Sequence, residues 1–145
     1  LIADEKIILP HASPADGRIR IAVSATVSTP LGEVQAYSVH LETPWLGPRA
    51  RMDQAETVLA HARAWPWPTV IAGDFNTGDP GALGAMVNLH EAERFAWASQ
   101  SAKRGALNTL DLAFARGFGV LASGAVDTAA SDHEPVWVSL RLSER

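Results

Sequence analysis

The feature that most constrains the fold is a continuous apolar run at residues 69–72, which stops at Gly73 and Asp74. A strand that lacks polar alternation is typical of burial on both faces. Both faces of such a strand must be covered by other elements, and a pair of stacked sheets with helices outside satisfies this requirement. The run therefore favours a layered arrangement of sheets and helices.

The rest of the chain predicts further elements around this run. Strands are expected at residues 6–9, 18–27, 33–41, 69–72, 110–115, 119–125 and 135–142. Helices are expected at residues 49–65, 82–89 and 91–97. Ile19, Ile21 and Val23 alternate on one face of the second strand, which is typical of a period-2 strand in an antiparallel hairpin. The expected fold class is α+β.

The totals limit the class of protein. A chain of 145 residues is enough for one domain, and 47% hydrophobic with 19% charged residues is typical of a globular protein. With no cysteine, disulfides and thiolate chemistry are excluded. A net charge of −4 argues against a strong sequence-independent grip on duplex DNA. No apolar run has the length of a transmembrane segment, and nothing in the sequence indicates a compartment.

Polar side chains gather at the ends of the expected apolar strands. They are His40, Asp74, Asn76, Asp111, Asp132 and His133. Any one of them alone is typical of a strand-end cap or a satisfied buried polar group, but so many in one small domain indicate a shared site. Carboxylates and amides suit Mg²⁺ or Mn²⁺, and histidine is the natural proton acceptor at neutral pH. The combination predicts hydrolysis of a phosphoester by water.

Five segments resemble, in order and spacing, motifs of the endonuclease/exonuclease/phosphatase family. They are residues 39–43, Arg51 with Gln54, residues 71–76, residues 110–114 and residues 131–136. The resemblance covers residues 20–138. It implies a four-layer α/β/β/α sandwich of two mixed sheets with outer helices. It also implies a metal-dependent phosphoester hydrolase, either a phosphodiesterase or nuclease, or a phosphatase.

The resemblance implies a role for each catalytic candidate. His133 is the general base or the histidine that activates the phosphate, and Asp111 holds its ring in orientation. Asp74 and Asn76 position the attacking water and the phosphate. His40 polarises the phosphate or the leaving oxygen.

The remaining implied roles concern the metal and the phosphate. Asp132, together with Asp74, is expected to bind Mg²⁺ or Mn²⁺. Arg20 matches a position where some members of the family carry an arginine that contacts the phosphate, so it is expected to join Asn76 and His40 there. Arg51 and Gln54 are expected to be structural.

Two further residues of the family find no match in the chain. The family carries an upstream Asn on its first strand and a Glu that is the principal metal ligand. We therefore expect residues 1–145 to be the C-terminal portion of a single domain, whose partner is the missing N-terminal half or another copy of the chain. The alternative is a truncated or degenerate binding module without catalysis. The substrate class stays open among nucleic acids, lipid headgroups and small phosphoesters.

Overall fold

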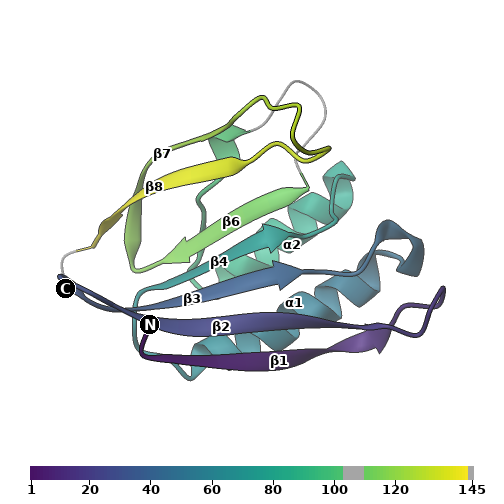
Figure 1. Ribbon diagram of the computed structural model, residues 1–145, viewed down its shortest axis with the longest axis horizontal. Helices are drawn as coiled ribbons and strands as arrows, with labels where there is room; N and C mark the ends of the chain where they lie inside the picture. The colour runs from purple at the N-terminus through teal and green to yellow at the C-terminus, as the bar shows by residue number, and fades with distance from the viewer. Residues whose placement is uncertain (103–109, 144–145) are drawn as a thin grey trace.

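A computed structural model describes residues 1–102 and 110–143. It contains a six-stranded mixed sheet in the order β1-β2-β3-β4-β6-β5, and a two-stranded sheet of β7 and β8 (Figure 1). The strands are β1 (Ala3–Ala12), β2 (Ile19–Thr29), β3 (Gly32–His40), β4 (Thr69–Asp74), β5 (Ala96–Trp97), β6 (Asp111–Arg116), β7 (Phe118–Ala125) and β8 (Val136–Leu142). The helices are α1 (Pro48–Arg63) and α2 (Pro80–Ala92), with 3-10 turns at Pro44–Leu46 and Gln100–Ala102. The predicted α+β class with two sheets is confirmed.

The strand connections bring three strand ends to one edge of the large sheet. β1, β2 and β3 are antiparallel neighbours, whereas β3 and β4 are parallel and are joined through α1. A parallel pair needs such a crossover. β6 then runs antiparallel to β4. The carboxyl ends of β3 and β4 therefore lie beside the start of β6.

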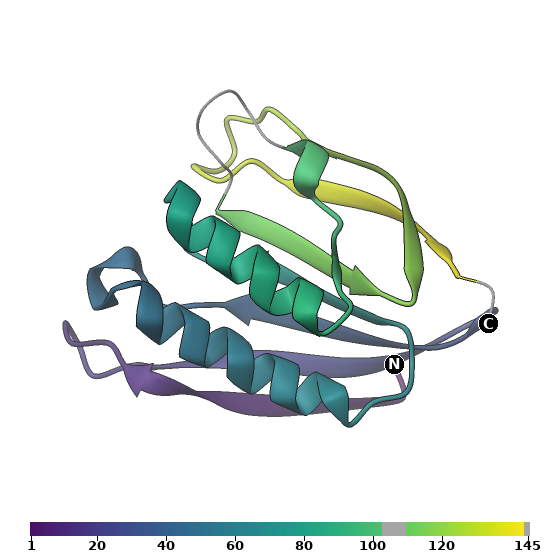
Figure 2. The same cartoon turned by 180° about the vertical axis from the view of Figure 1, so that it is seen from behind.

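Both helices cover the same face of the large sheet (Figure 2). The predicted apolar stripe of α1 lies against that face, where Ala55, Val58 and Leu59 are buried. The core on this side is built from Leu9, Leu41, Leu59, Ile71, Phe75, Met86, Phe95 and Phe114. Each large apolar side chain buried in this way contributes roughly 1.5–3 kcal/mol, so the helical layer accounts for most of the core.

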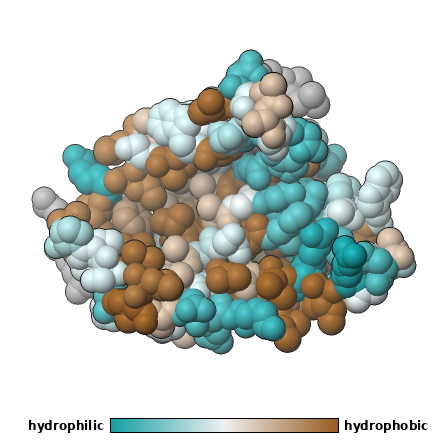
Figure 3. Space-filling model, in the orientation of Figure 1, coloured by the Kyte–Doolittle hydropathy of each residue, from teal (hydrophilic) through white to brown (hydrophobic). Residues whose placement is uncertain are grey.

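The face of β2 that points away from the helices carries the alternating apolar side chains noted in the sequence. Ile19, Ile21 and Val23 point away from the helices and are 57%, 43% and 42% exposed. Small and polar side chains such as Ser24 and Thr26 face the helices instead. Hydrophobic side chains gather on this uncovered face of the molecule (Figure 3). Its exposure indicates that the described residues lack a layer at this position.

The second sheet covers part of the same face. Ala98, Ala113 and Ala115 form a small cluster, against which Val138 and Leu140 of β8 pack. Small residues on the large sheet allow the second sheet to approach closely. β4 is therefore covered on both sides, as its apolar run predicts, by helices on one side and by β7 and β8 on the other.

Two sequence predictions need correction. Residues 91–97 are not a separate helix, because α2 ends at Ala92 and Ala96–Trp97 forms β5. Arg94 adopts a left-handed conformation with φ 63°, and the Phe95 N–H bonds to the carbonyl of His90, which ends the helix. β1 is longer than predicted, because a proline is tolerated on an edge strand.

The segment after β5 contains the Gln100–Ala102 turn, and residues 103–109 lie outside the described residues. Within the described ranges, neither helix combines the length and the apolar character that crossing a bilayer requires.

Candidate active site

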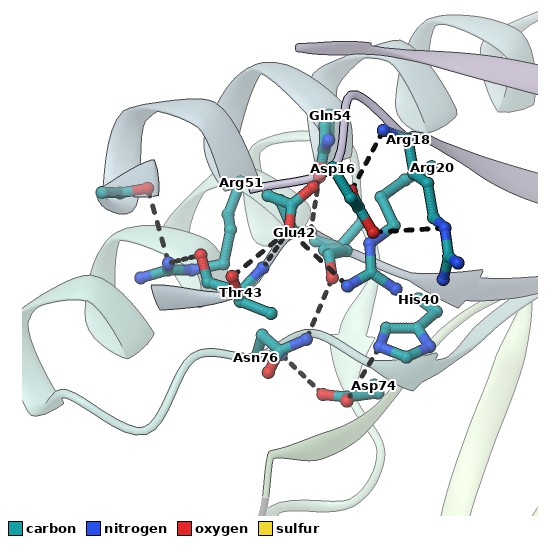
Figure 4. A network of polar contacts seen from close by, with 12 residues as sticks. Asp16, Arg18, Arg20, His40, Glu42, Thr43, Arg51, Gln54, Asp74 and Asn76 are labelled. Atoms are coloured by element: carbon teal, nitrogen blue, oxygen red, sulfur yellow. Dashed lines mark hydrogen bonds and ion pairs between the residues drawn. The ribbon is translucent and has the colours of Figure 1, made fainter. Parts of the chain in front are cut away.

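The site begins where β3 and β4 end side by side. The parallel register pairs His40 with Asp74, and Nε2 of His40 lies 3.5 Å from Oδ2 of Asp74 (Figure 4). Gly73 makes this approach possible, since a Cβ at this position would lie 2.0 Å from the carbonyl oxygen of Val39. Gly73 also has φ +142°, a conformation that side chains rarely adopt. The glycine therefore sets the spacing of the two strand ends.

The turn after β4 sends alternate side chains to the core and to the site. Phe75 is buried among aromatic rings, whereas Asp74 and Asn76 point toward the strand ends. Oδ1 of Asp74 accepts a hydrogen bond of 2.7 Å from the Asn76 N–H, and Asn76 Nδ2 donates to the Leu41 carbonyl at 2.9 Å. Asn76 has φ 49°, which asparagine tolerates better than most residues. These bonds fix the Asn76 amide beside Asp74.

A carboxylate–imidazole pair lies next to these groups. Asp111 opens β6 and is the register partner of Asp74 in the antiparallel ladder. Its Oδ2 lies 2.6 Å from Nδ1 of His133, which comes from the loop between β7 and β8. This hydrogen bond, opposed by partial burial, raises the pKa of His133, and the charges of Asp111, Asp74 and Asp132 add to the rise. Nε2 of His133 is the ring nitrogen that remains for a substrate.

Five of the predicted residues are therefore brought to one edge of the sheet. They are His40, Asp74, Asn76, Asp111 and His133. Asp132 is exposed and adjacent to His133, close enough for its charge to raise the pKa of that imidazole. The roles given to these residues stay predictions.

Two side chains of α1 brace the loops that carry the site. Arg51 is buried, and it donates to the Thr77 hydroxyl at 3.2 Å and to the Thr43 carbonyl at 3.3 Å. Gln54 accepts from the Glu42 N–H and donates to the Pro10 carbonyl, both at 2.8 Å. The loops after β3 and β4 are thereby tied to one helix, in agreement with the structural role expected of this pair.

The sequence prediction missed one charged group. Glu42 follows β3 and is buried, with its carboxylate 3.5 Å from Nη2 of Arg20. Arg20, which was expected to contact the phosphate, thus has the Glu42 carboxylate as a partner on one side of its guanidinium. A carboxylate placed directly after an apolar strand was the available signal for this group.

The described residues hold no complete set of protein ligands for a metal ion. Among the described residues, no group of three or more Asp, Glu or His side chains could hold a metal ion. The two oxygens of Asp74 already face the Asn76 N–H and His40. Mg²⁺ often uses one or two carboxylates together with phosphate oxygens and water, so Asp74 and Asp132 would need those further oxygens to complete a site.

The stacked sheets, the helical layer and the polar groups at the strand ends define a class of fold. It is the fold of endonuclease/exonuclease/phosphatase proteins, over part of their length. No protein-family model matches the chain, and no curated protein sequence matches it.

Three solved structures illustrate the likeness. An endonuclease/exonuclease/phosphatase from Bacteroides vulgatus is 19% identical with a TM-score of 0.73, and the match covers 97% of this chain and 65% of that one. A mannosyl-6-phosphatase from Bacteroides thetaiotaomicron is 18% identical with a TM-score of 0.70, covering 97% and 66%. The human Nocturnin catalytic domain is 17% identical with a TM-score of 0.72, covering 98% and 59%. The chain thus spans less than two thirds of the length of each of these three proteins.

Proposed function

We propose that the chain is the catalytic C-terminal portion of a phosphoester hydrolase. The observation that carries this proposal is the Asp111–His133 pair, which lies at the same sheet edge as Asp74, His40 and Asn76. A carboxylate-oriented imidazole beside further hydrogen-bonding groups is suited to activating water and to stabilising negative charge on a phosphoryl group.

Each side chain has a role that follows from its position. His133 offers Nε2 to the reacting group, because Nδ1 is engaged by Asp111. Neutral, this nitrogen accepts a proton from water; charged, it donates to a phosphoryl oxygen. Asn76, held by the Leu41 carbonyl, orients water or phosphate together with Asp74. His40 lies on the other side of Asp74 and contacts the phosphate or the leaving oxygen.

Mg²⁺ or Mn²⁺ is the proposed cofactor, with Asp132 and Asp74 as the ligands from this chain. The ion would supply charge stabilisation at the phosphate. The described residues hold no group of three acidic or imidazole ligands, so phosphate oxygens, water or a ligand from a further segment would complete the coordination.

A further polypeptide segment is the proposed partner. It covers the exposed face formed by Ile8, Ile19, Ile21 and Val23. About a third of each matched protein lies outside the region that this chain covers, which favours a segment equivalent to the unmatched part over a second copy of the chain. The same segment would supply the additional metal ligand.

The proposed substrate class is a phosphoester, and the proposal does not specify the size of the substrate molecule. One matched protein is named as a mannosyl-6-phosphatase, and the Nocturnin domain was solved with a bound sulfate anion. Both descriptions suit a site that binds a tetrahedral anion. The net charge of −4 disfavours long duplex DNA.

The test is hydrolysis of p-nitrophenyl phosphate and bis(p-nitrophenyl) phosphate by the longest polypeptide that the gene encodes, with and without Mg²⁺. His133→Ala should lower kcat by about 100-fold or more. His11→Ala is the matched control, since His11 also pairs with an aspartate, Asp53, at 2.8 Å but lies outside the proposed site.

Equal hydrolysis by the wild type and His133→Ala would reject the catalytic assignment. Complete lack of Mg²⁺-dependent hydrolysis by the longest polypeptide would instead support a degenerate binding module. The observation that favours such a binding module is that the described residues hold no group of three potential metal ligands.

A further inference from the structure

Glu42 is a buried carboxylate whose two oxygens have unequal partners. Its side chain is 1% exposed. Oε1 accepts from the Thr43 N–H at 2.9 Å and from the Thr43 hydroxyl at 3.2 Å, and lies 3.5 Å from Nη2 of Arg20. No donor among the described residues reaches Oε2. An unpaired buried carboxylate oxygen costs free energy, so stability alone does not explain a glutamate at this position.

The cation that faces Glu42 also lines a cavity beside the proposed site. Arg20 is 27% exposed and turns toward Glu42 from the start of β2 (Figure 4). The cavity measures about 340 Å³, and its lining includes Arg18, Arg20 and His40. The one carboxylate in the lining, Asp16, lies 3.1 Å from Nε of Arg18. The cavity therefore presents two guanidinium groups, each facing one carboxylate, and through His40 it adjoins the phosphoryl site.

We propose that Glu42 is a positioning residue that holds Arg20 so that the other N–H groups of its guanidinium bind a phosphate in this cavity. This inference rests on the proposed function and adds a residue to the same site. A guanidinium has five N–H donors, and Glu42 engages one end of the fork. An arginine that is already held loses less conformational freedom when an anion binds, which raises its affinity for the anion.

A positional role and a purely electrostatic role predict opposite results for Glu42→Gln. If Glu42 acted only through its charge, its removal would strengthen anion binding, because a negative charge near the phosphate would disappear. If Glu42 positions Arg20, its removal weakens anion binding despite the gain in positive potential. The sign of the change separates the two roles.

The experiment is an NMR titration of inorganic phosphate into the chain, followed at the Arg20 Nε–H and at the rings of His40 and His133. Glu42→Gln should weaken phosphate binding by roughly 3- to 10-fold, the cost of ordering one long side chain. Arg20→Ala should weaken it at least as much, and the double variant should match Arg20→Ala alone. Glu91→Gln, an exposed glutamate on α2, is the control and should bind as the wild type does.

Urea denaturation checks that each variant is folded. If Glu42→Gln does not fold, Arg20→Lys provides the same test, since a lysine keeps the charge but lacks the fork that Glu42 holds. Unchanged or tighter phosphate binding by Glu42→Gln or Arg20→Lys overturns the inference, as does phosphate that leaves the Arg20 signal unmoved. Neither result would reject the hydrolase proposal, which is tested separately by the His133→Ala assay.

Discussion

Acid should destabilise the protein through one buried histidine, His90 of α2. The side chain is 1% exposed, its ring stacks on Phe114 with centroids 3.9 Å apart, and its Nδ1 bonds to the Met86 carbonyl at 2.8 Å. Burial lowers the pKa of His90 from 6.5 to about 4, and the hydrogen bond to Met86 opposes this only in part. The folded protein therefore keeps the ring neutral where the unfolded chain would charge it.

The difference in pKa between the folded and the unfolded state sets the sign and the size of the change in the free energy of unfolding with pH. As the pH falls from 6.5 toward 4, the unfolded state takes up a proton that the folded state refuses, so the free energy of unfolding decreases across this window and levels off below it. One pKa unit corresponds to about 1.4 kcal/mol, so going from pH 7.5 to pH 4.5 should cost about 2.5 kcal/mol through His90 alone. That is a large fraction of the stability of an ordinary domain.

Urea denaturation followed by tryptophan fluorescence, at several pH values between 7.5 and 4.5, measures this dependence. His90→Phe is the reference variant, because a phenyl ring suits a pocket of Phe75, Phe95 and Phe114 and carries no proton. Carboxylates titrate in both proteins, so the difference between the two pH dependences isolates His90. Parallel curves for the wild type and His90→Phe would refute the reasoning.

Three further predictions concern residues that shape the site. Gly73→Ala should lower the free energy of unfolding, measured by urea denaturation, by more than roughly 3 kcal/mol, because of backbone strain and the clash with β3. The control is Gly84→Ala, at a position on α2 with open space around it, which should not have this cost. Equal effects of the two substitutions would contradict the argument. Asp111→Asn should lower the pKa of His133 toward its ordinary value in an NMR titration, and an unmoved pKa would contradict the hydrogen bond. Gln54→Ala should cost about 2–5 kcal/mol by leaving the buried Glu42 N–H and the partly buried Pro10 carbonyl unpaired; a cost below 1 kcal/mol, measured by urea denaturation, would show that they find other partners.

Local chemistry explains what the sequence could predict. The unbroken apolar run before Gly73 indicated a doubly covered strand, and the three-and-four spacing around Val58 indicated the helix that covers it. Glycine followed by alternating polar and aromatic residues at 73–76 indicated a turn that presents Asp74 and Asn76. In each case the deciding interaction lies within a few residues along the chain.

What the sequence could not predict depends on long-range geometry. The alternation in β2 predicts a strand, but not that Ile21 lies on the uncovered side, because the covering layer is not among the described residues. The pairing of Arg20 with Glu42 depends on how the start of β2 meets the loop after β3. Arg94 ends α2 in a left-handed conformation that arginine itself does not favour.

The origin of His133 on the second sheet has a mechanical consequence. Asp74, Asn76 and His40 belong to the large sheet, so the distance from them to the imidazole is set by how closely the two sheets stack. Ala113 and Ala115, where the two sheets pack, therefore help to set the distance between His133 and Asp74, although neither is a polar residue of the candidate site. A larger side chain at either position would push the two sheets apart. It would thereby move His133 away from Asp74, Asn76 and His40 without replacing any polar group of the site.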